Sequence, residues 1–353
     1  MKKTKKNYTG KIITVLGPIN PLDLGITLCH EHLISDGSFF VREPNNETEK
    51  EMINYPVTLD ILWWLRFHHA QNIDDLKLLD DEEAIEEVLH FRNLGGKSIV
   101  EVSSVGLGRN PEALARISKK TGINIIMGSG YYTERSYNFK MREKSEKSII
   151  EEIVNDILNG VEDTGIHSGI IGEIGCSYPL TKNELKSLRA AAFAKKLTGA
   201  PLMIHPGINE YAPMEIIGII KKIGVDLTHV VICHIERTLR NPNRRIEIAE
   251  TGCFLEYDLF GMEGYYPRHL RILDLPNDAQ RVDEIIELIE KGFQNQILIS
   301  HDVFTKRSRR RYGGWGYDHI LRNVLTLMKD KGLKDEQINN IIIENPKRLL
   351  TFR

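Results

Sequence analysis

Short apolar stretches alternate along the chain with longer stretches in which apolar residues return at helical spacing. The apolar stretches comprise residues 26–30, 98–102, 123–128, 169–174, 201–205, 230–234, 252–257 and 296–301. The helix-like stretches comprise residues 81–94, 111–120, 148–160, 181–197, 213–222, 242–249 and 279–291. Continuous apolar runs are typical of strands covered on both faces, and single helices between them indicate parallel pairing through right-handed crossovers.

Eight strand–helix units without a linker favour a closed (β/α)8 barrel, the TIM barrel of the α/β class. A doubly wound open sheet is the alternative, but no GxGxxG motif follows the first strand. We expect residues 1–353 to form a single barrel domain. Residues 39–80 are too many for a simple connection after the first strand, and they predict a helical insertion.

Composition narrows the class of protein. The chain is 41 % hydrophobic and 27 % charged, as is typical of a soluble protein with a sizeable core. Its 47 basic and 49 acidic residues give a net charge of −2, which favours neither a nucleic acid nor a membrane as partner. The cysteines lack CxxC spacing and lie in or beside apolar runs, which predicts buried thiols in a reducing cytoplasm: Cys29, Cys176, Cys233 and Cys253.

Metal-binding side chains fall at the ends of five of the eight predicted strands. The carboxyl ends of the strands carry the active site in barrels of this kind. The candidate ligands there are His30, His32, Glu173, His205, His234 and Asp302. Residues i and i+2 of a strand point the same way, so His30 and His32 both face the barrel axis. Counting back from the other ligands predicts that four residues fill the barrel below them: Ile171, Met203, Ile232 and Ser300.

Six protein ligands exceed the three that one catalytic zinc typically uses. Two divalent cations that share a bridging carboxylate account for the number. The predicted ligands of the first ion are His30, His32 and Asp302. Those of the second ion are His205 and His234. Glu173 would bridge the ions together with a hydroxide, and Asp302 would accept the proton of the attacking water and deliver it to the leaving group. Taken singly, Glu173 could be an ion-pair partner and Asp302 a helix N-cap.

Residues 25–33, GITLCHEHL, resemble the N-terminal zinc signature of the phosphotriesterase family in the amidohydrolase superfamily. Further blocks of the resemblance follow in order: GIIGEIGCSYPLT, IHPG, CHIERT, EYDLFG, HDVFTK, YGGWGY and IENPKRLLTF. Together they resemble the phosphotriesterase-related branch in particular. The resemblance implies a binuclear zinc hydrolase with the ligand sets given above. True phosphotriesterases bridge the metals with a carbamylated lysine, whereas Glu173 occupies that strand end here.

The loops after the strands are expected to choose the substrate. Tyr131 and Tyr132 follow the third strand and could donate a hydrogen bond to a polarised carbonyl group; packing within the loop is the alternative. Arg237 is a candidate clamp for an anionic group, and a salt bridge with Glu236 or Asp258 is its alternative.

Two further features lie near the predicted site. Tyr257 follows the seventh strand and is a candidate to line the same cavity. Residues 306–311 carry five cations beside a glycine-rich turn, which indicates either attraction of an anionic substrate or a solvated charge run. By strand alternation, His301 is expected to point away from the axis and to support the ligands from outside.

We therefore expect a cytoplasmic hydrolase in which a metal-bridging hydroxide attacks the amide or ester carbonyl of a small, anionic molecule, with N-acyl amino compounds favoured. Hydrolysis of a lactone or phosphoester at the same site is the alternative, and a non-catalytic barrel that binds a small molecule is an alternative of another class. A metallonuclease is disfavoured because only residues 306–311 offer basic surface. The expected partner is the substrate, with no nucleic acid and no membrane, and a homodimer is the assembly considered.

Overall fold

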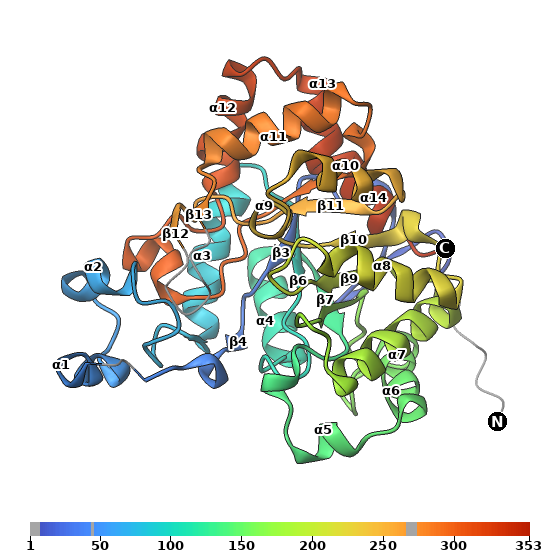
Figure 1. The fold of residues 1–353 in the computed structure, drawn as a ribbon, viewed down its shortest axis with the longest axis horizontal. Coiled ribbons are helices and arrows are strands. Elements are labelled where there is room, and N and C mark those ends of the chain that lie inside the picture. The colour runs from blue at the N-terminus through green and yellow to red at the C-terminus, as the bar shows by residue number, and fades with distance from the viewer. Residues whose placement is uncertain (1–7, 44–45, 266–273) are drawn as a thin grey trace.

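A nearly closed barrel of parallel strands forms the centre of the computed structural model, which describes residues 8–43, 46–265 and 274–353 (Figure 1). Each barrel strand overlaps one of the eight predicted stretches, and the (β/α)8 barrel is therefore confirmed. In chain order the strands are β3 (Thr27–Glu31), β6 (Ser98–Glu101), β7 (Asn124–Ser129), β8 (Ile170–Gly175), β9 (Leu202–His205), β10 (Val230–Ile232), β11 (Phe254–Tyr257) and β14 (Ile297–Ile299).

The helices cover the outside of the barrel, and local signals begin and end them. Thr181 and Glu184 form a capping box at the start of α7, and Gly199 ends that helix in the left-handed conformation that glycine adopts without strain. The helices that match the seven predicted stretches are α3 (Asp81–Asn93), α4 (Pro111–Thr121), α6 (Glu146–Leu158), α7 (Lys182–Thr198), α8 (Ala212–Ile223), α10 (Pro242–Glu250) and α11 (Asp278–Glu290). The remaining α-helices are α1 (Glu47–Lys50), α2 (Leu62–Leu65), α5 (Phe139–Glu143), α9 (Ile235–Thr238), α12 (Leu325–Asp330), α13 (Asp335–Asn339) and α14 (Asn345–Leu350).

Short antiparallel pairs lie outside the barrel: β1 (Ile12–Thr14) with β2 (Gly17–Ile19), β4 (Ser35–Asp36) with β5 (Lys77–Leu78), and β12 (Gly264–Tyr265) with β13 (Asp274–Leu275). In the part of the chain that the structure describes, no helix is both long and apolar enough to cross a bilayer. The four cysteines are free and buried, as the sequence predicts.

Side chains close the barrel where its first and last strands meet. The hydrogen-bonded order runs from β14 through β11, β10, β9, β8, β7 and β6 to β3, so β14 and β3 are the outer strands. The Ser300 hydroxyl accepts the backbone N–H of His30 at 3.0 Å. The buried Glu31 carboxylate accepts from the Ser300 hydroxyl at 2.8 Å, the His301 N–H at 2.9 Å, the His301 ring at 2.7 Å and the Val303 N–H at 3.0 Å. Glu31 thus joins the two strand ends.

The core has two layers. Val100, Ile126, Met203 and their neighbours form one apolar cluster inside the barrel, and a larger cluster joins the outer faces of the strands to the helices. Met203 lies inside as predicted, but the same prediction for Ile171 and Ile232 is wrong, because both belong to the outer cluster. The regular alternation fails before it reaches the ligands: β8 changes register between residues 171 and 174, and His234 lies beyond the end of β10 with φ of 54°.

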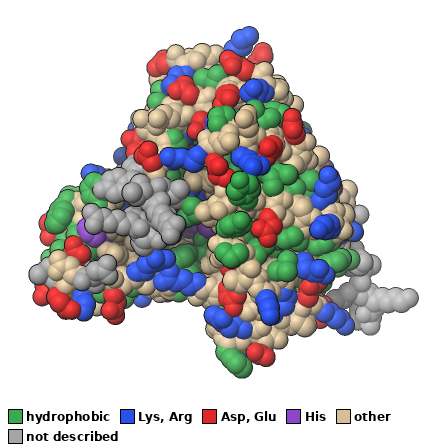
Figure 2. All heavy atoms as spheres, viewed as in Figure 1, with side chains coloured by type: hydrophobic (Ala, Val, Ile, Leu, Met, Phe, Trp, Pro, Cys, Tyr) green, Lys and Arg blue, Asp and Glu red, His purple; other side chains and the backbone are tan. Residues whose placement is uncertain are grey.

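The insertion after β3 forms short helical turns instead of long helices. It includes α1, α2 and 3₁₀ turns at Ser38–Phe40, Glu51–Asn54 and Leu59–Ile61, and it projects to one side of the barrel (Figure 1). Val57, Ile61, Trp64 and Leu65 give it a small core of its own. Figure 2 shows Lys and Arg side chains gathered where the insertion meets the rest of this face.

Candidate metal centre

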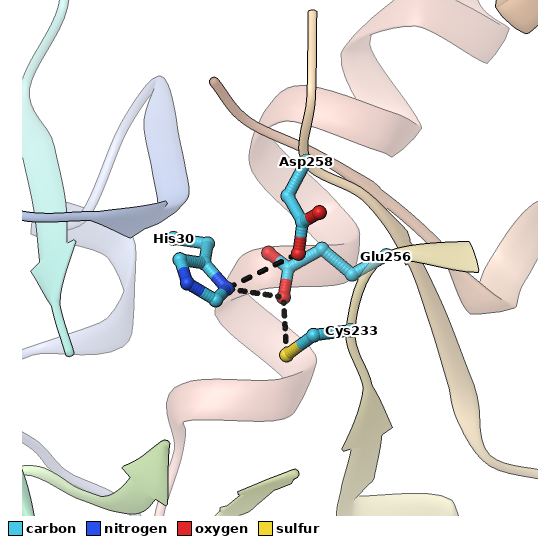
Figure 3. A group of neighbouring side chains, drawn as sticks. All are labelled: His30, Cys233, Glu256 and Asp258. Atoms are coloured by element: carbon cyan, nitrogen blue, oxygen red, sulfur yellow. Dashed lines mark hydrogen bonds and ion pairs between the residues drawn. The ribbon is translucent and has the colours of Figure 1, made fainter. Parts of the chain in front are cut away.

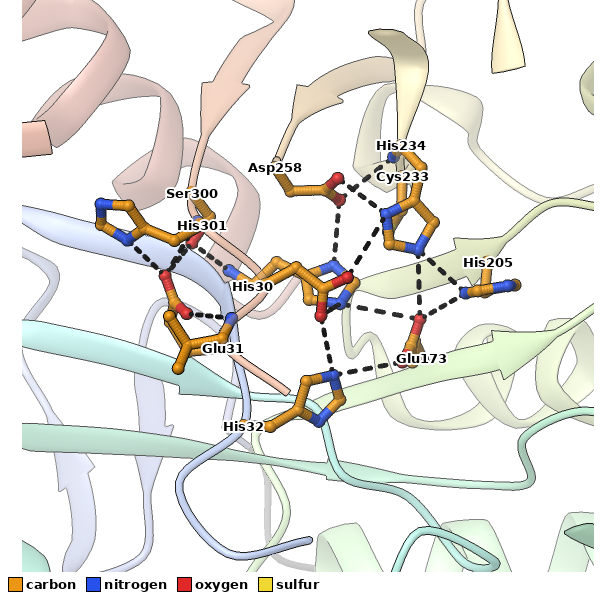
Figure 4. A network of polar contacts seen from close by, with 12 residues as sticks. His30, Glu31, His32, Glu173, His205, Cys233, His234, Asp258, Ser300 and His301 are labelled. Atoms are coloured by element: carbon orange, nitrogen blue, oxygen red, sulfur yellow. Dashed lines mark hydrogen bonds and ion pairs between the residues drawn. The ribbon is translucent and has the colours of Figure 1, made fainter. Parts of the chain in front are cut away.

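The six predicted ligands converge at the carboxyl ends of the strands. Glu173 contacts all four histidines (Figure 4). Its Oε2 lies 3.0 Å from His205 Nδ1, 3.6 Å from His30 Nε2 and 3.7 Å from His234 Nε2. Its Oε1 lies 3.5 Å from His32 Nε2. A carboxylate in this position can offer one oxygen to each of two neighbouring cations.

Asp302 completes one side of the cluster. Its Oδ1 lies 3.1 Å from His32 Nε2 and 3.6 Å from His30 Nε2. On the other side, His234 Nε2 and His205 Nδ1 face each other at 2.9 Å. Asp302 and His234 both have φ near 50°, a left-handed conformation that few residues with a side chain adopt. Strain of this kind concentrates at functional sites.

The donor set fits a divalent cation. Ligand atoms of His30, His32 and Asp302 lie within 4.8 Å of one another, and so do those of His30, Glu173 and His234. Nε2 of His30 has no hydrogen-bond partner among the described residues, although the side chain is fully buried. A buried polar group without a partner is costly, and a cation at Nε2 would satisfy the ring nitrogen that faces the cluster.

The charges of the cluster favour cation binding. Burial raises the pKa of Glu173, but the opposing influence of His30 and then His205 is larger in sum and brings that pKa well below its usual value. Burial lowers the pKa of His205 to about 4, which leaves a neutral ring at pH 7. Burial also lowers the pKa of His234, but the negative charge of Asp258 raises it by more, and the pKa of His234 is about 9. A cation would displace the proton that His234 otherwise holds, so metal binding and protonation compete.

Two of the candidate ligands, His32 and His234, and the neighbouring His301 each have a hydrogen-bond partner on the ring. His32 Nδ1 lies 2.9 Å from the Ser103 hydroxyl, which donates to Glu101 at 2.6 Å. His234 Nδ1 lies 2.7 Å from Asp258, and His301, as expected, turns away from the axis toward Glu31. Sequence reasoning gave no such role to Ser103, Glu101 or Asp258. The signal that could have found the two carboxylates is their place at the ends of the second and seventh strands.

A cavity of about 520 Å³ opens over the cluster. His32, Glu173, His205 and Asp302 line one part of it. The other lining residues include aromatic rings and cations, namely Phe40, Arg42, Tyr132, Arg135, Arg237 and Phe304. The cavity therefore offers ligand atoms, apolar surface and positive charge to one small molecule.

Two of the four predicted substrate contacts line this cavity. The Tyr132 hydroxyl lies 3.3 Å from His205 Nδ1. Arg237 is only 6 % exposed; it donates to the Pro206 carbonyl at 2.8 Å, and its Nε has no partner among the described residues. The predicted alternative for Arg237 is not observed among the described residues, because Glu236 pairs with Arg281 and Asp258 with His30 and His234.

The other two tyrosines do not reach the cavity. The Tyr131 hydroxyl donates to Glu152 at 2.8 Å, on the helical side of the barrel. Tyr257 belongs to the outer core cluster, because alternation along β11 turns Glu256 inward and its neighbour outward. The structure thus brings Tyr132 and Arg237 to the ligand cluster but not Tyr131 or Tyr257.

The basic run at residues 306–311 is neutralised within the fold, so the expected attraction of an anionic substrate by this run is not supported. Each of its five cations has a carboxylate oxygen within 3.2 Å. The pairs are Lys306 with Asp74, Arg307 with Asp75, Arg309 with Glu83, Arg310 with Asp318 and Arg311 with Glu86. Four of these acids lie on the insertion's end or on α3, so the run attaches that part of the chain to the barrel.

A (β/α)8 barrel with a buried histidine–carboxylate cluster at the strand ends defines a barrel protein that could hold divalent cations. Residues 10–350 match the phosphotriesterase family, and the chain belongs to that family. The buried cluster is consistent with the binuclear metal site typical of its members.

Named relatives cover nearly the whole chain. An N-acetyltaurine hydrolase from Dictyostelium discoideum is 43 % identical over 364 residues, which span 97 % of this chain and 98 % of the relative. The crystal structure of a resiniferatoxin-binding protein from Rhodobacter sphaeroides is 37 % identical with a TM-score of 0.93, over 97 % of this chain and 95 % of that one. The crystal structure of a lactonase from Listeria monocytogenes is 27 % identical with a TM-score of 0.79, over 97 % of this chain and 99 % of that one.

Proposed function

We propose that this protein is a binuclear zinc hydrolase that cleaves the amide bond of small N-acyl amino compounds with an acidic end, such as N-acetyltaurine. The observation that carries the proposal is a single cavity that both Arg237 and the ligand cluster line. A substrate with a carbonyl group at one end and a sulfonate or carboxylate at the other matches both. The 43 % identical N-acetyltaurine hydrolase supports the same class of substrate.

The proposed ligand sets are those that the sequence predicts. His30, His32 and Asp302 would hold one ion, His205 and His234 the other, and Glu173 would bridge them. Imidazole and carboxylate donors without thiolate suit zinc in a catalytic site. Two bound zinc ions supply a water that ionises near neutral pH and a Lewis acid for the carbonyl group.

The chain's own residues would then bind the substrate and move protons. Asp302 holds the proton of the attacking water and passes it to the nitrogen of the leaving amine, which cannot depart as an anion. Tyr132 donates a hydrogen bond to the carbonyl oxygen as negative charge develops there. Arg237 binds the acidic end through its guanidinium group and so sets the distance between that end and the scissile bond.

Lactone hydrolysis is the second candidate, and the likeness to the Listeria lactonase favours it. The same cluster could attack either kind of carbonyl group. A neutral lactone, however, would leave the buried charge of Arg237 without a partner when it fills the cavity, which is costly. Acidic amides are therefore the preferred class of substrate.

The test is a substrate panel with zinc-reconstituted protein. It contains N-acetyltaurine, N-acetylglycine, the neutral analogue N-acetylethanolamine, a γ-lactone and a paraoxon-like ester. Acetate release should be at least about 10-fold more efficient, in kcat/KM, for the acidic amides than for the neutral one, as expected for a charge-assisted hydrogen bond. Faster turnover of the lactone, or undiminished activity after zinc has been removed by a chelator, would refute the proposal.

A further inference from the structure

One carboxylate lies against histidines on both sides of the ligand cluster. Asp258 directly follows β11 and is fully buried. Its Oδ1 lies 2.7 Å from His234 Nδ1, and its Oδ2 accepts the backbone N–H of His234 at 3.1 Å. The same Oδ2 lies 3.1 Å from Nδ1 of His30 (Figure 3).

The two histidines that Asp258 contacts belong to different proposed metal sites, His30 to the first and His234 to the second. Their Nε2 atoms face Glu173 at 3.6 and 3.7 Å. A carboxylate can only accept hydrogen bonds, so each ring must carry a proton on Nδ1 to satisfy it. The lone pair of each Nε2 is then directed into the cluster, as a ligand requires.

We propose that Asp258 is a positioning residue shared by both metal sites, which orients His30 and His234 at the same time. The proposal rests on the two-ion site of the proposed function.

Neighbouring groups do not offer the same contacts. Glu256 Oε2 is farther from His30 Nδ1, at 3.7 Å, and its second described partner is the thiol of Cys233 at 3.4 Å (Figure 3). Asp258 is therefore the carboxylate that lies within hydrogen-bond distance of both rings.

The chain also offers a matched control. Among the described residues, Ser103 contacts one proposed ligand, His32 of the first ion, at 2.9 Å. Loss of the Ser103 hydroxyl should disturb one metal site, whereas loss of the Asp258 carboxylate should disturb both. The difference is one of position, because both side chains are completely buried.

The experiment measures zinc binding by equilibrium dialysis and metal analysis of the wild type, Asp258→Asn and Ser103→Ala, with circular dichroism to check folding. Asp258→Asn should lower the affinity for each of the two ions by about 10- to 100-fold, the usual effect of removing an outer partner of a metal-bound histidine. Ser103→Ala should lower the affinity for one of the two ions only. A loss in Asp258→Asn that is confined to one ion, or no loss, overturns the role of Asp258.

A second variant separates position from charge. Asp258→Glu keeps the charge but moves it by one methylene group, so it should still weaken both ions and, at saturating cobalt, change the visible absorption of the bound metal. It also carries the test if Asp258→Asn does not fold. Wild-type affinities and spectrum in Asp258→Glu would overturn positioning. A wild type that holds only one ion overturns the two-ion site as well, whereas two ions in the wild type with insensitive Asp258 variants overturn this inference alone.

Discussion

Arg237→Ala should weaken the binding of acidic substrates more than the binding of neutral ones. Arg237 is 6 % exposed, so solvent screens its charge little, and Nε has no partner among the described residues while another N–H group donates to the Pro206 carbonyl. A hydrogen bond between charged groups contributes about 1.5–3 kcal/mol. Because about 1.4 kcal/mol corresponds to a factor of ten, KM for N-acetyltaurine should rise about 10- to 150-fold. KM for the neutral N-acetylethanolamine should change by less than about threefold.

The assay is steady-state acetate release from both substrates over a range of concentrations, with zinc content measured for each preparation. Arg135→Ala is the matched control, because Arg135 lines the same cavity but is exposed. An exposed charge pair contributes at most about 1 kcal/mol, so this variant should change KM by less than about fivefold. Equal losses for the acidic and the neutral substrate in Arg237→Ala would remove Arg237 from the binding of the acidic end.

Three further predictions concern metal content and stability. Glu173→Ala should lose at least one zinc ion and nearly all activity; an active variant with two ions, by metal analysis, would contradict the bridging role. Glu31→Gln should lower the free energy of unfolding of the metal-free protein by about 3 kcal/mol, because an amide N–H group would face buried donors at the β14–β3 junction; a change below about 1 kcal/mol in urea unfolding would contradict this estimate. Burial lowers the pKa of Lys195 to about 7 from 10.5, so the unfolded chain binds an extra proton between these pH values and stability should rise with pH there. Relative to Lys195→Met, the wild type should gain roughly 2 kcal/mol from pH 7 to pH 9, and parallel stability curves would rule this out.

Most of the architecture could be predicted because its signals are local. A buried parallel strand needs a continuous apolar run, and a crossover helix needs a periodic one, so eight strands and seven helices could be located approximately from the pattern. The candidate ligands followed from the topology, since strand ends of one barrel meet at one rim. Tyr257 shows the limit of that rule. It follows the apolar run as a ligand would, but the pleat of β11 turns it outward and turns Glu256 inward.

The amino-acid sequence alone thus determined the barrel, the family and which side chains stand at the rim. Only the tertiary structure decided how they are held. Glu31 and His301 are 270 positions apart, and the carboxylates that pair with residues 306–311 lie mostly more than 200 positions away. Asp258 becomes a partner of His30 only when the first and seventh barrel strands are brought together. Such contacts depend on distances between distant segments, and no local pattern of residues encodes those distances.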